Sequence, residues 1–314
     1  MTRTVLFPGL GLEFHLNRVA FQLFGLPVYW YGVIIAAGFL LAVAFCYKMA
    51  PRFGIKPDDV IDLLFFAVPL AIIGARLYYI VFYLDFYRTA GGGLDVLKML
   101  DIRDGGLAIY GGVIAAALTL LAFCRVRRID FFAFADLGAF GLLIGQCIGR
   151  WGNFMNVEAY GGPTGLPWRM GIDAYVDGVW QYMEVHPTFL YESLWNLLGF
   201  LLLLSVVLRK KRKFDGEIMG GYFLWYGFGR GLIEGLRTDS LYLFHTPIRV
   251  SQALGFASAL AAAAFLFYHL VLRRHKPEEL YANRVAAARR AAREAKQRQT
   301  TSQQEEEHHG GEDH

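Results

Sequence analysis

The sequence predicts an all-α integral membrane protein with about seven transmembrane helices. Of its 314 residues, 55% are hydrophobic and 18% are charged, whereas soluble domains carry about 25% charged residues. The apolar residues form long runs, and Lys and Arg fall in short clusters between these runs. Because the net charge of +4 is small and no basic patch is interleaved with aromatic residues, we expect no binding to nucleic acid.

Seven segments have the length and the apolar character of membrane spans, which need about 20 residues each. The sixth of them is the weakest prediction, because it contains several glycines and three charged residues. Together the seven segments predict a transmembrane body over residues 28–272 that follows an external N-terminal segment, residues 1–27. The predicted spans cover residues 28–48, 59–84, 106–124, 131–150, 188–208, 217–236 and 249–272.

Basic residues predict the orientation of these spans. They cluster after the first, third, fifth and seventh spans, for example as RKKRK at 209–213. Because short cytoplasmic segments carry an excess of Lys and Arg, we expect the N-terminus outside and the C-terminus inside. The external segment 151–187 is rich in Gly, Pro and aromatic residues. We expect it to form a small folded head, with short strands as one option, and residues 85–104 to form a second external element.

The C-terminal tail, residues 273–314, differs in composition from the body. An Ala/Arg-rich stretch at 281–299 favours a helix, and the polar, acidic residues that follow favour disorder. The tail is therefore expected to be cytoplasmic and partly helical. Its basic part either contacts anionic lipid or is simply solvated.

Cysteine usage gives no sign of a metal site or a disulfide framework. Cys46, Cys124 and Cys147 lie in or at the ends of apolar runs and show no CxxC spacing, so they are expected to be small buried hydrophobic residues. No nucleotide-binding loop is visible either. The sequence therefore predicts neither a metal ion nor a cofactor.

Charged residues inside the predicted spans fall at one depth. With a rise of about 1.5 Å per residue, Arg76, Arg150 and Arg230 lie near the outer ends of three spans, and Glu192 and Glu234 lie at the same level. Ionisable groups in a membrane are costly and are candidates for function. Since guanidinium groups suit phosphate, the pattern predicts a site for an anionic phospholipid headgroup in the outer leaflet. The alternative is that interfacial arginines merely reach toward lipid phosphates.

Asp136 does not fit this layer. Asp136 lies in the inner half of the fourth span, and we expect it to cap the start of that span or to pair with a basic group.

The fourth span runs directly into a polar stretch, GRWGNFMNVEAYGG at 149–162. We expect Gly149 and Gly152 to let the backbone turn there and to approach other groups closely. This stretch resembles the signature of the prolipoprotein diacylglyceryl transferase family. The family pattern Arg-x-Gly-Asn-Phe-x-Asn-x-Glu-x-x-Gly is matched without departure by Arg150, Gly152, Asn153, Phe154, Asn156, Glu158 and Gly161.

Five further stretches resemble the same family in the expected order, and the resemblance covers roughly residues 10–272. They are VYWYG around Tyr31, GARLYY around Arg76, DGGLAIYGG around Tyr110, HPTFLYE at 186–192 and YGFGRGLIEGLRTD at 226–239.

The resemblance implies an enzyme of the bacterial inner membrane, multi-pass, with its active site facing the outer leaflet. The implied reaction transfers the diacylglyceryl group of phosphatidylglycerol to the lipobox cysteine thiol of a prolipoprotein signal peptide. It forms a thioether, releases glycerol phosphate and is the first step of lipoprotein maturation. A transporter or lipid flippase, and a non-catalytic scaffold, are the competing classes. A transporter is expected to carry polar groups through the full depth and often internal symmetry, whereas this sequence has one polar layer.

Roles for individual residues follow from the resemblance and from the chemistry of the leaving phosphate. Arg150 and Arg230 are expected to hold the phosphate and to stabilise it as it leaves, with help from Arg76. Asn153, Glu158 and Gly161 are expected in substrate binding, and Glu158 and Glu234 in orienting the arginines. Tyr31 and Tyr226 either line the headgroup pocket or belong to the aromatic belt at the membrane interface.

The proton acceptor for the thiol stays open. Tyr110 is a catalytic candidate because it stands where some relatives carry a histidine that has been proposed as the base. A tyrosine, with an ordinary pKa of about 10, is a poor base at neutral pH. His186, Glu158 and Glu234 are alternatives, and direct loss of the proton to water is another.

Overall fold

In the computed structural model, the chain consists of two compact units. The first unit comprises residues 1–46 and 135–314, and the second comprises residues 47–134. The structure describes residues 2–88, 93–101, 105–176, 178–243 and 246–309.

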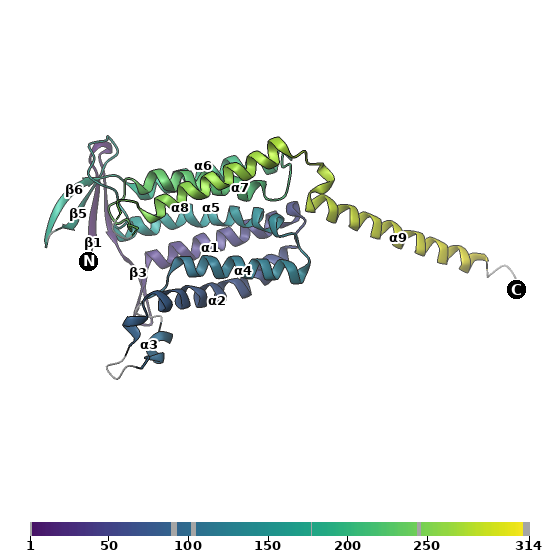
Figure 1. Cartoon of the computed structure of the whole chain (residues 1–314), viewed down its shortest axis with the longest axis horizontal. Coiled ribbons are helices and arrows are strands. Elements are labelled where there is room, and N and C mark those ends of the chain that lie inside the picture. The colour runs from purple at the N-terminus through teal and green to yellow at the C-terminus, as the bar shows by residue number, and fades with distance from the viewer. Residues whose placement is uncertain (1, 89–92, 102–104, 177, 244–245, 310–314) are drawn as a thin grey trace. The chain divides into compact units, whose positions relative to one another are not determined.

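Long apolar helices dominate the first unit (Figure 1). The helices α7 and α8 pack closely where two glycines face each other. A Cβ atom built on Gly227 would lie 2.6 Å from the carbonyl oxygen of Gly255. Small residues at such a crossing let helix backbones pack tightly without a hydrophobic driving force in lipid. The helices of this unit are α1 (Trp30–Met49), α5 (Phe131–Asn156), α6 (Thr188–Leu208), α7 (Glu217–Glu234) and α8 (Val250–Phe267), and the first and second of these each extend a few residues into the second unit.

A four-stranded antiparallel sheet joins the two external segments that the sequence predicts separately. Its order is β2-β1-β5-β6, so the N-terminal strands pair with the strands of the 151–187 head. Val5, Ile172 and Val185 form a core beneath the sheet. Phe154 of α5 stacks on Phe189 of α6 at 4.6 Å and joins this core to the helices. The strands are β1 (Thr2–Phe7), β2 (Leu12–Asn17), β5 (Met170–Val176) and β6 (Val179–Val185).

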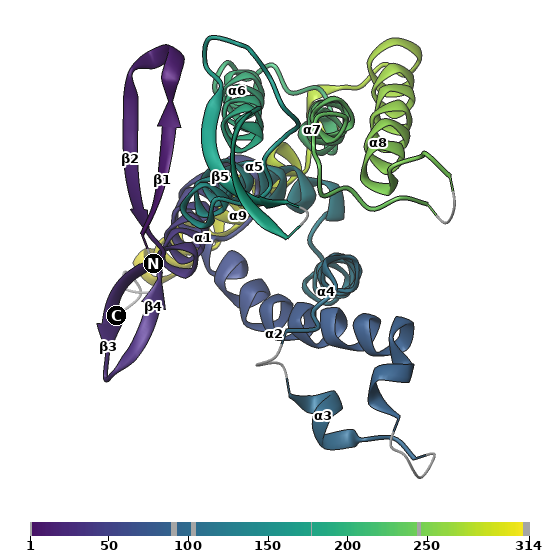
Figure 2. The ribbon, with the colours of Figure 1, turned by 90° about the vertical axis from the view of Figure 1, so that its left-hand side faces the viewer.

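A separate hairpin, β3 (Val19–Leu23) and β4 (Leu26–Tyr29), leads into α1 (Figure 2). Its two-residue turn places Phe24 at φ 50° and Gly25 at φ 80°. Positive φ at both central positions matches the right-handed twist of the strands. The structure therefore puts strands throughout most of the segment 1–27, for which the sequence predicts no particular fold.

The helical membrane class is confirmed. Six of the described helices are long and apolar enough to cross a membrane, and each matches a predicted span. The remaining prediction, 217–236, corresponds to the helix α7, which is not one of the six. The count of seven spans and their orientation stay predictions. The six are Trp30–Phe53, Pro57–Phe82, Ile109–Arg127, Phe131–Asn156, Thr188–Leu208 and Val250–Leu272.

The expectation that the backbone turns at Gly149 and Gly152 is wrong. The helix α5 continues through both glycines to Asn156, and the chain turns afterwards, with φ 51° at Val157 and φ 57° at Ala159. Close approach is confirmed at Gly152, where a Cβ atom would lie 2.9 Å from the ring of Tyr31. Tyr31 therefore packs α1 against the end of α5.

The second unit is built on the pair α2 (Pro57–Phe82) and α4 (Ile109–Arg127). A Cβ atom on Gly111 would lie 2.3 Å from the carbonyl oxygen of Gly74, so only glycine permits this crossing. The predicted external element at 85–104 contains a 3-10 turn, Leu84–Tyr87, and the short helix α3 (Val96–Leu100). Residues 89–92 and 102–104 of that prediction lie outside the described residues.

Asp136 caps a helix other than its own. Its buried carboxylate accepts hydrogen bonds from the backbone N–H groups of Gly216 at 3.0 Å and Met219 at 2.8 Å, at the start of α7. Arg212 lies 3.6 Å away, so the predicted pairing with a basic group is confirmed. The predicted cap belongs to α7, not to the fourth span. Asp136 thereby fixes where α7 begins.

The tail forms one long helix, α9 (Tyr281–His309). The side chain of Asp215 accepts a hydrogen bond of 2.7 Å from the backbone of Tyr281 and ties the start of the helix to the chain before α7. The helix continues through residues 301–309, where the sequence predicts disorder. Gln and Glu have good helix propensity and so extend the Ala/Arg-rich helix. Residues 310–314 lie outside the described residues.

We expect Asp136→Ala to destabilise the protein by about 3 kcal/mol or more, because it removes a carboxylate from a buried guanidinium and from two helix N–H groups. Asp62→Ala is the matched control. Asp62 pairs with Arg127 at a half-exposed position, and such pairs contribute about 0–1 kcal/mol. Thermal unfolding in detergent should show a much larger loss for Asp136→Ala, and equal losses would contradict the capping role.

Candidate active site

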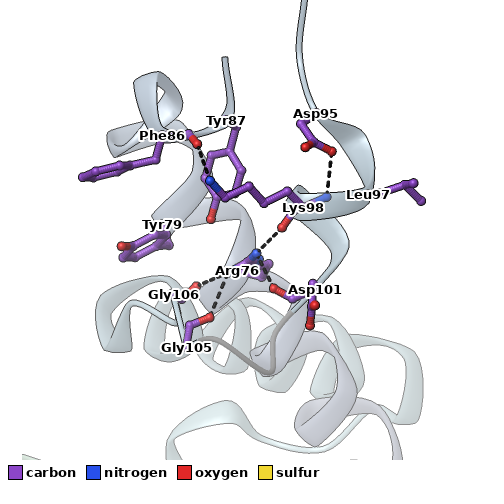
Figure 3. Close-up of a pocket in the computed structure, with 10 residues that line it drawn as sticks. All are labelled: Arg76, Tyr79, Phe86, Tyr87, Asp95, Leu97, Lys98, Asp101, Gly105 and Gly106. Atoms are coloured by element: carbon purple, nitrogen blue, oxygen red, sulfur yellow. Dashed lines mark hydrogen bonds between the residues drawn. The ribbon is translucent and has the colours of Figure 1, made fainter. Parts of the chain in front are cut away.

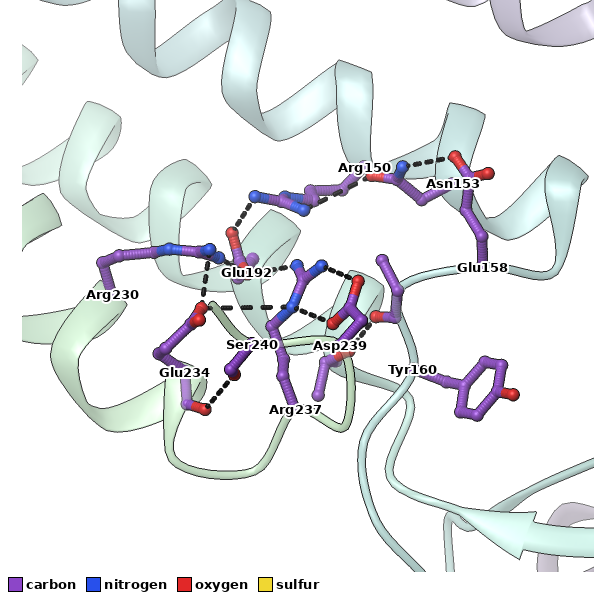
Figure 4. A network of polar contacts seen from close by, with 12 residues as sticks. Arg150, Asn153, Glu158, Tyr160, Glu192, Arg230, Glu234, Arg237, Asp239 and Ser240 are labelled. Carbon is purple, nitrogen blue, oxygen red and sulfur yellow. Dashed lines mark hydrogen bonds and ion pairs between the residues drawn. The ribbon is translucent and has the colours of Figure 1, made fainter. Parts of the chain in front are cut away.

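Three helices of the first unit bring their charged residues into one network (Figure 4). Arg150 comes from the last turns of α5, and Glu192 from the first turns of α6. Arg230 and Glu234 lie on the last turns of α7, and Arg237 follows directly after that helix. The predicted convergence of Arg150 and Arg230 is therefore present in the structure.

The Glu192 carboxylate is the centre of the network. Its side chain is 3% exposed, and its Oε1 accepts a 2.7 Å hydrogen bond from Arg230 Nη1. Its Oε2 forms an ion pair with Arg150 Nη2. Arg237 Nη1 lies 3.6 Å from Oε1. One carboxylate thus holds guanidinium groups from two different helices side by side.

A second carboxylate, Glu234, contacts two of these arginines, Arg230 and Arg237. It is 2% exposed, and its Oε2 lies 2.6 Å from Arg230 Nη2 and 4.0 Å from Arg237 Nε. Its backbone carbonyl accepts a hydrogen bond from the Arg249 guanidinium. The expectation that Glu234 orients an arginine agrees with these contacts.

Arg237 is also held by Asp239 in a bidentate pair, with hydrogen bonds of 2.9 Å and 2.7 Å. Partial burial opposes the charge on both groups, but the pairing outweighs it. The pKa of Asp239 is therefore lowered and the pKa of Arg237 is raised from their ordinary values. Both side chains stay ionised at neutral pH.

The motif at the end of α5 forms a chain of contacts from Arg150 outward. Arg150 Nη1 donates to Asn153 Oδ1 at 3.4 Å, and Asn153 Nδ2 donates to Glu158 Oε1 at 2.8 Å. Because Arg150 and Asn153 are three residues apart on a helix, they share one face. The amide of Asn153 thus links an arginine of the network to a carboxylate that follows the turn.

Gly161 holds backbone segments together. Its N–H donates to the carbonyl oxygen of His186 at 3.0 Å, and the N–H of Gly162 donates to that of Leu236 at 2.8 Å. A Cβ atom on Gly161 would lie 2.7 Å from His186 Cβ and 2.9 Å from the oxygen of Leu236. Glycine is therefore required where the loop, the head and the segment before Arg237 meet.

Three further predicted residues make contacts with neighbouring side chains or backbone. The ring of His186 contacts Tyr191, with Nδ1 and Oη 3.3 Å apart. Tyr226 stacks on Tyr222, with ring centroids 5.5 Å apart. Tyr31 packs against Gly152. In the described part of the chain, no group of three or more His, Cys, Asp or Glu side chains is placed to hold a metal ion.

Arg76 belongs to the second unit, where backbone oxygens surround its guanidinium (Figure 3). Its five N–H groups donate to five carbonyl oxygens at 2.5 to 3.0 Å. The side chain lines a cavity of about 590 Å³ together with Lys98 and Gly106. Full occupation of the donors argues against the predicted contact with a phosphate. The carbonyl oxygens belong to Lys98, Met99, Asp101, Gly105 and Gly106.

Tyr110 also belongs to the second unit and is the second residue of α4, with 40% of its surface exposed. Its catalytic role stays a prediction.

The network includes residues to which the sequence assigns no individual role. Glu192, Arg237 and Asp239 all carry contacts of the network. Two signals point to them. Glu192 ends the family-like stretch HPTFLYE, and Arg237 and Asp239 lie within the last such stretch. Their pairing depends on tertiary contacts and is not visible in the sequence.

The fold and the network define a multi-pass membrane protein with a buried arginine–carboxylate site. The model of the prolipoprotein diacylglyceryl transferase family matches residues 18–268. A phosphatidylglycerol--prolipoprotein diacylglyceryl transferase of Enterococcus faecalis is 45% identical, over 85% of this chain and 94% of the relative. Proteins of the same name from Finegoldia magna and Bacillus cereus are 44% and 42% identical, over 78% and 82% of this chain and 93% of each relative. The chain belongs to this family.

We expect Gly161→Ala to destabilise the protein by about 1–3 kcal/mol, because the added Cβ atom meets backbone and Cβ atoms that have no room to move. Gly165→Ala is the control, since nothing lies within 4 Å of a Cβ atom there. Thermal unfolding in detergent measures both variants. A Gly161→Ala protein as stable as Gly165→Ala would show that the contact is not tight.

We expect Arg76→Lys to destabilise the second unit by about 2–4 kcal/mol. Lysine has three donors and no planar fork, so at least two buried carbonyl oxygens would lose their hydrogen bonds. Arg88→Lys is the matched control, because Arg88 pairs with Asp85 at the surface. Differential unfolding of the two variants tests this, and similar melting temperatures would exclude a structural role for the five bonds.

Proposed function

We propose that the network around Glu192 is the active site at which a diacylglyceryl group passes from phosphatidylglycerol to a prolipoprotein. This transfer is the first step of lipoprotein maturation and is the activity of the family to which the chain belongs. The chain is accordingly an enzyme, a transferase. Family membership gives no support to the competing classes of transporter, flippase or scaffold.

One observation supports this site above all: guanidinium groups of two helices converge on a single oxyanion. Arg150 and Arg230 hold the two oxygens of one carboxylate. A phosphodiester offers two oxygens in a comparable arrangement, and arginine forks recognise carboxylate and phosphate in the same way. The pair is also 20% and 16% exposed, so a headgroup can reach it.

The chemistry requires positive charge at the leaving group. In the proposed reaction, the sulfur of the lipobox cysteine attacks the glycerol carbon that carries the phosphate. A carbon–sulfur bond forms, the carbon–oxygen bond breaks, and glycerol phosphate leaves with the electron pair. Arg150 and Arg230 stabilise the charge that develops on the departing oxygen. The products are a thioether and glycerol phosphate.

The other residues of the network are proposed to hold these two arginines in place. Asn153 and Glu158 orient Arg150 or contact the glycerol head, and Glu234 orients Arg230. Gly161 fixes the segment that precedes Arg237. Tyr31 and Tyr226 are proposed to line the headgroup pocket. The roles predicted for Arg76, Tyr110 and His186 stay predictions.

The chain is a multi-pass membrane protein. The bacterial inner membrane and a site facing its outer leaflet are proposed because the basic clusters lie beyond alternate spans, on the side opposite Arg150.

We expect Arg150→Ala and Arg230→Ala each to lower turnover about 100- to 1,000-fold, the loss typical for one stabilising donor in a transition state. The assay is mass spectrometry of a lipobox peptide incubated with phosphatidylglycerol, where transfer adds the mass of a diacylglyceryl group. Arg169→Ala serves as a control because Arg169 pairs with Glu184 in the head. Near-normal turnover of both site variants with intact folding would discard the assignment.

A further inference from the structure

The charges of the network are balanced before any substrate arrives. Its ion pairs involve the guanidinium groups of Arg150, Arg230 and Arg237, and the carboxylates Glu192, Glu234 and Asp239. A phosphodiester adds one negative charge to this neutral set. An unbalanced charge in a buried site is costly. Binding therefore has to be coupled to a change at one of the carboxylates.

Two of the carboxylates are paired away from the place where the phosphate is proposed to bind. Asp239 holds Arg237 in a bidentate pair at a position with half of its side chain exposed. Glu234 contacts arginines that lie three and four residues from it on its own segment. Neither contact spans the gap between helices where the proposed phosphate lies.

Glu192 differs from both. Of the three carboxylates, it is the one that pairs with arginines of both α5 and α7, and its two oxygens lie where those of the proposed phosphate would bind. Its Oε2 is buried and forms an ion pair with Arg150, and its Oε1 forms one with Arg230.

We propose that Glu192 is the proton acceptor for the substrate thiol, and that it exchanges places with the lipid phosphate on Arg150 and Arg230. This inference rests on the proposed function. When the phosphate engages the two guanidinium groups, Glu192 loses its two nearest cationic partners while it stays buried, and its third cationic neighbour, Arg237, is paired with Asp239. A buried carboxylate whose charge is no longer matched takes up a proton rather than remain charged, and the thiol that enters the site supplies it.

The proton and charge balance closes without any further reactant. The thiol proton passes to Glu192, and the sulfur forms its bond to the glycerol carbon. The carbon–oxygen bond breaks, and its electron pair goes to the phosphate oxygen, so glycerol phosphate leaves as a dianion. One negative charge has moved from Glu192 to the leaving group. Both arginines are then free for the phosphate at the moment its charge rises, and Glu192 returns the proton to solvent after release.

The decisive variant is Glu192→Gln, which keeps the shape of the side chain but accepts no proton. We expect kcat to fall at least 100-fold, the size of a general-base contribution. The KM for phosphatidylglycerol should fall or stay unchanged, because a competing carboxylate is gone. The acidic limb of the pH profile of kcat should disappear. If Glu192 only holds the arginines in place, Glu192→Gln should instead raise the KM, lower the melting temperature and leave the pH profile of kcat intact.

A selenocysteine lipobox peptide supplies a second readout. A selenol ionises at much lower pH than a thiol and needs no acceptor. We expect the defect of Glu192→Gln to shrink at least 10-fold with this peptide. Glu192→Asp, which keeps a proton acceptor at shorter reach, should retain the acidic limb with reduced kcat and tests the idea even if Glu192→Gln folds poorly.

Glu184→Gln is the matched control, because Glu184 also pairs with an arginine but lies in the head. It should behave as the unaltered enzyme. If the unaltered enzyme adds no diacylglyceryl mass to the peptide, the proposed function itself fails. If that enzyme is active but Glu192→Gln keeps its kcat or its acidic limb, or selenocysteine gives no rescue, the role of Glu192 is wrong.

Discussion

The whole site depends on burying guanidinium groups among apolar helices, where carboxylates offset their positive charge. Glu192 meets this constraint for two helices at once, since it contacts both Arg150 and Arg230. The helices α5, α6 and α7 are therefore joined by charge at the level of the site and by small or aromatic residues elsewhere. The same carboxylate that holds the arginine pair together also stands where we propose that the lipid phosphate binds.

The surrounding architecture serves to keep these ends of the helices in register. Asp136 fixes the start of α7, and Gly161 fixes the segment beyond its end. Because both ends of α7 are held, Arg230 and Glu234 keep a fixed position along the helix axis relative to α5 and α6. Phe154 and Phe189 join the sheet to α5 and α6. The position of the arginine pair therefore depends on contacts at both ends of these helices.

The sequence predicts the helices well because long apolar runs leave few alternatives in a membrane. Six spans and the site arginines Arg150 and Arg230 follow from such runs and from buried charge. It predicts poorly what depends on distant pairing. Among the strands of residues 2–29, β1 has its second partner, β5, far along the chain, and that pairing is not visible in the sequence. Likewise, Gly149 and Gly152 suggest a turn, but packing against α1 keeps them helical.

The sheet has a consequence for how the molecule is assembled. Strand β1 emerges first, yet its neighbour on one side is β5, where Val5 pairs with Ile172. During synthesis, the hairpin of β1 and β2 therefore keeps one edge unpaired until α1, α2, α4 and α5 and then β5 have been made. Open strand edges invite pairing with other chains. A domain fused before β1 would hinder the pairing of β1 with β5, whereas a domain fused at the end of α9 would leave the sheet unaffected.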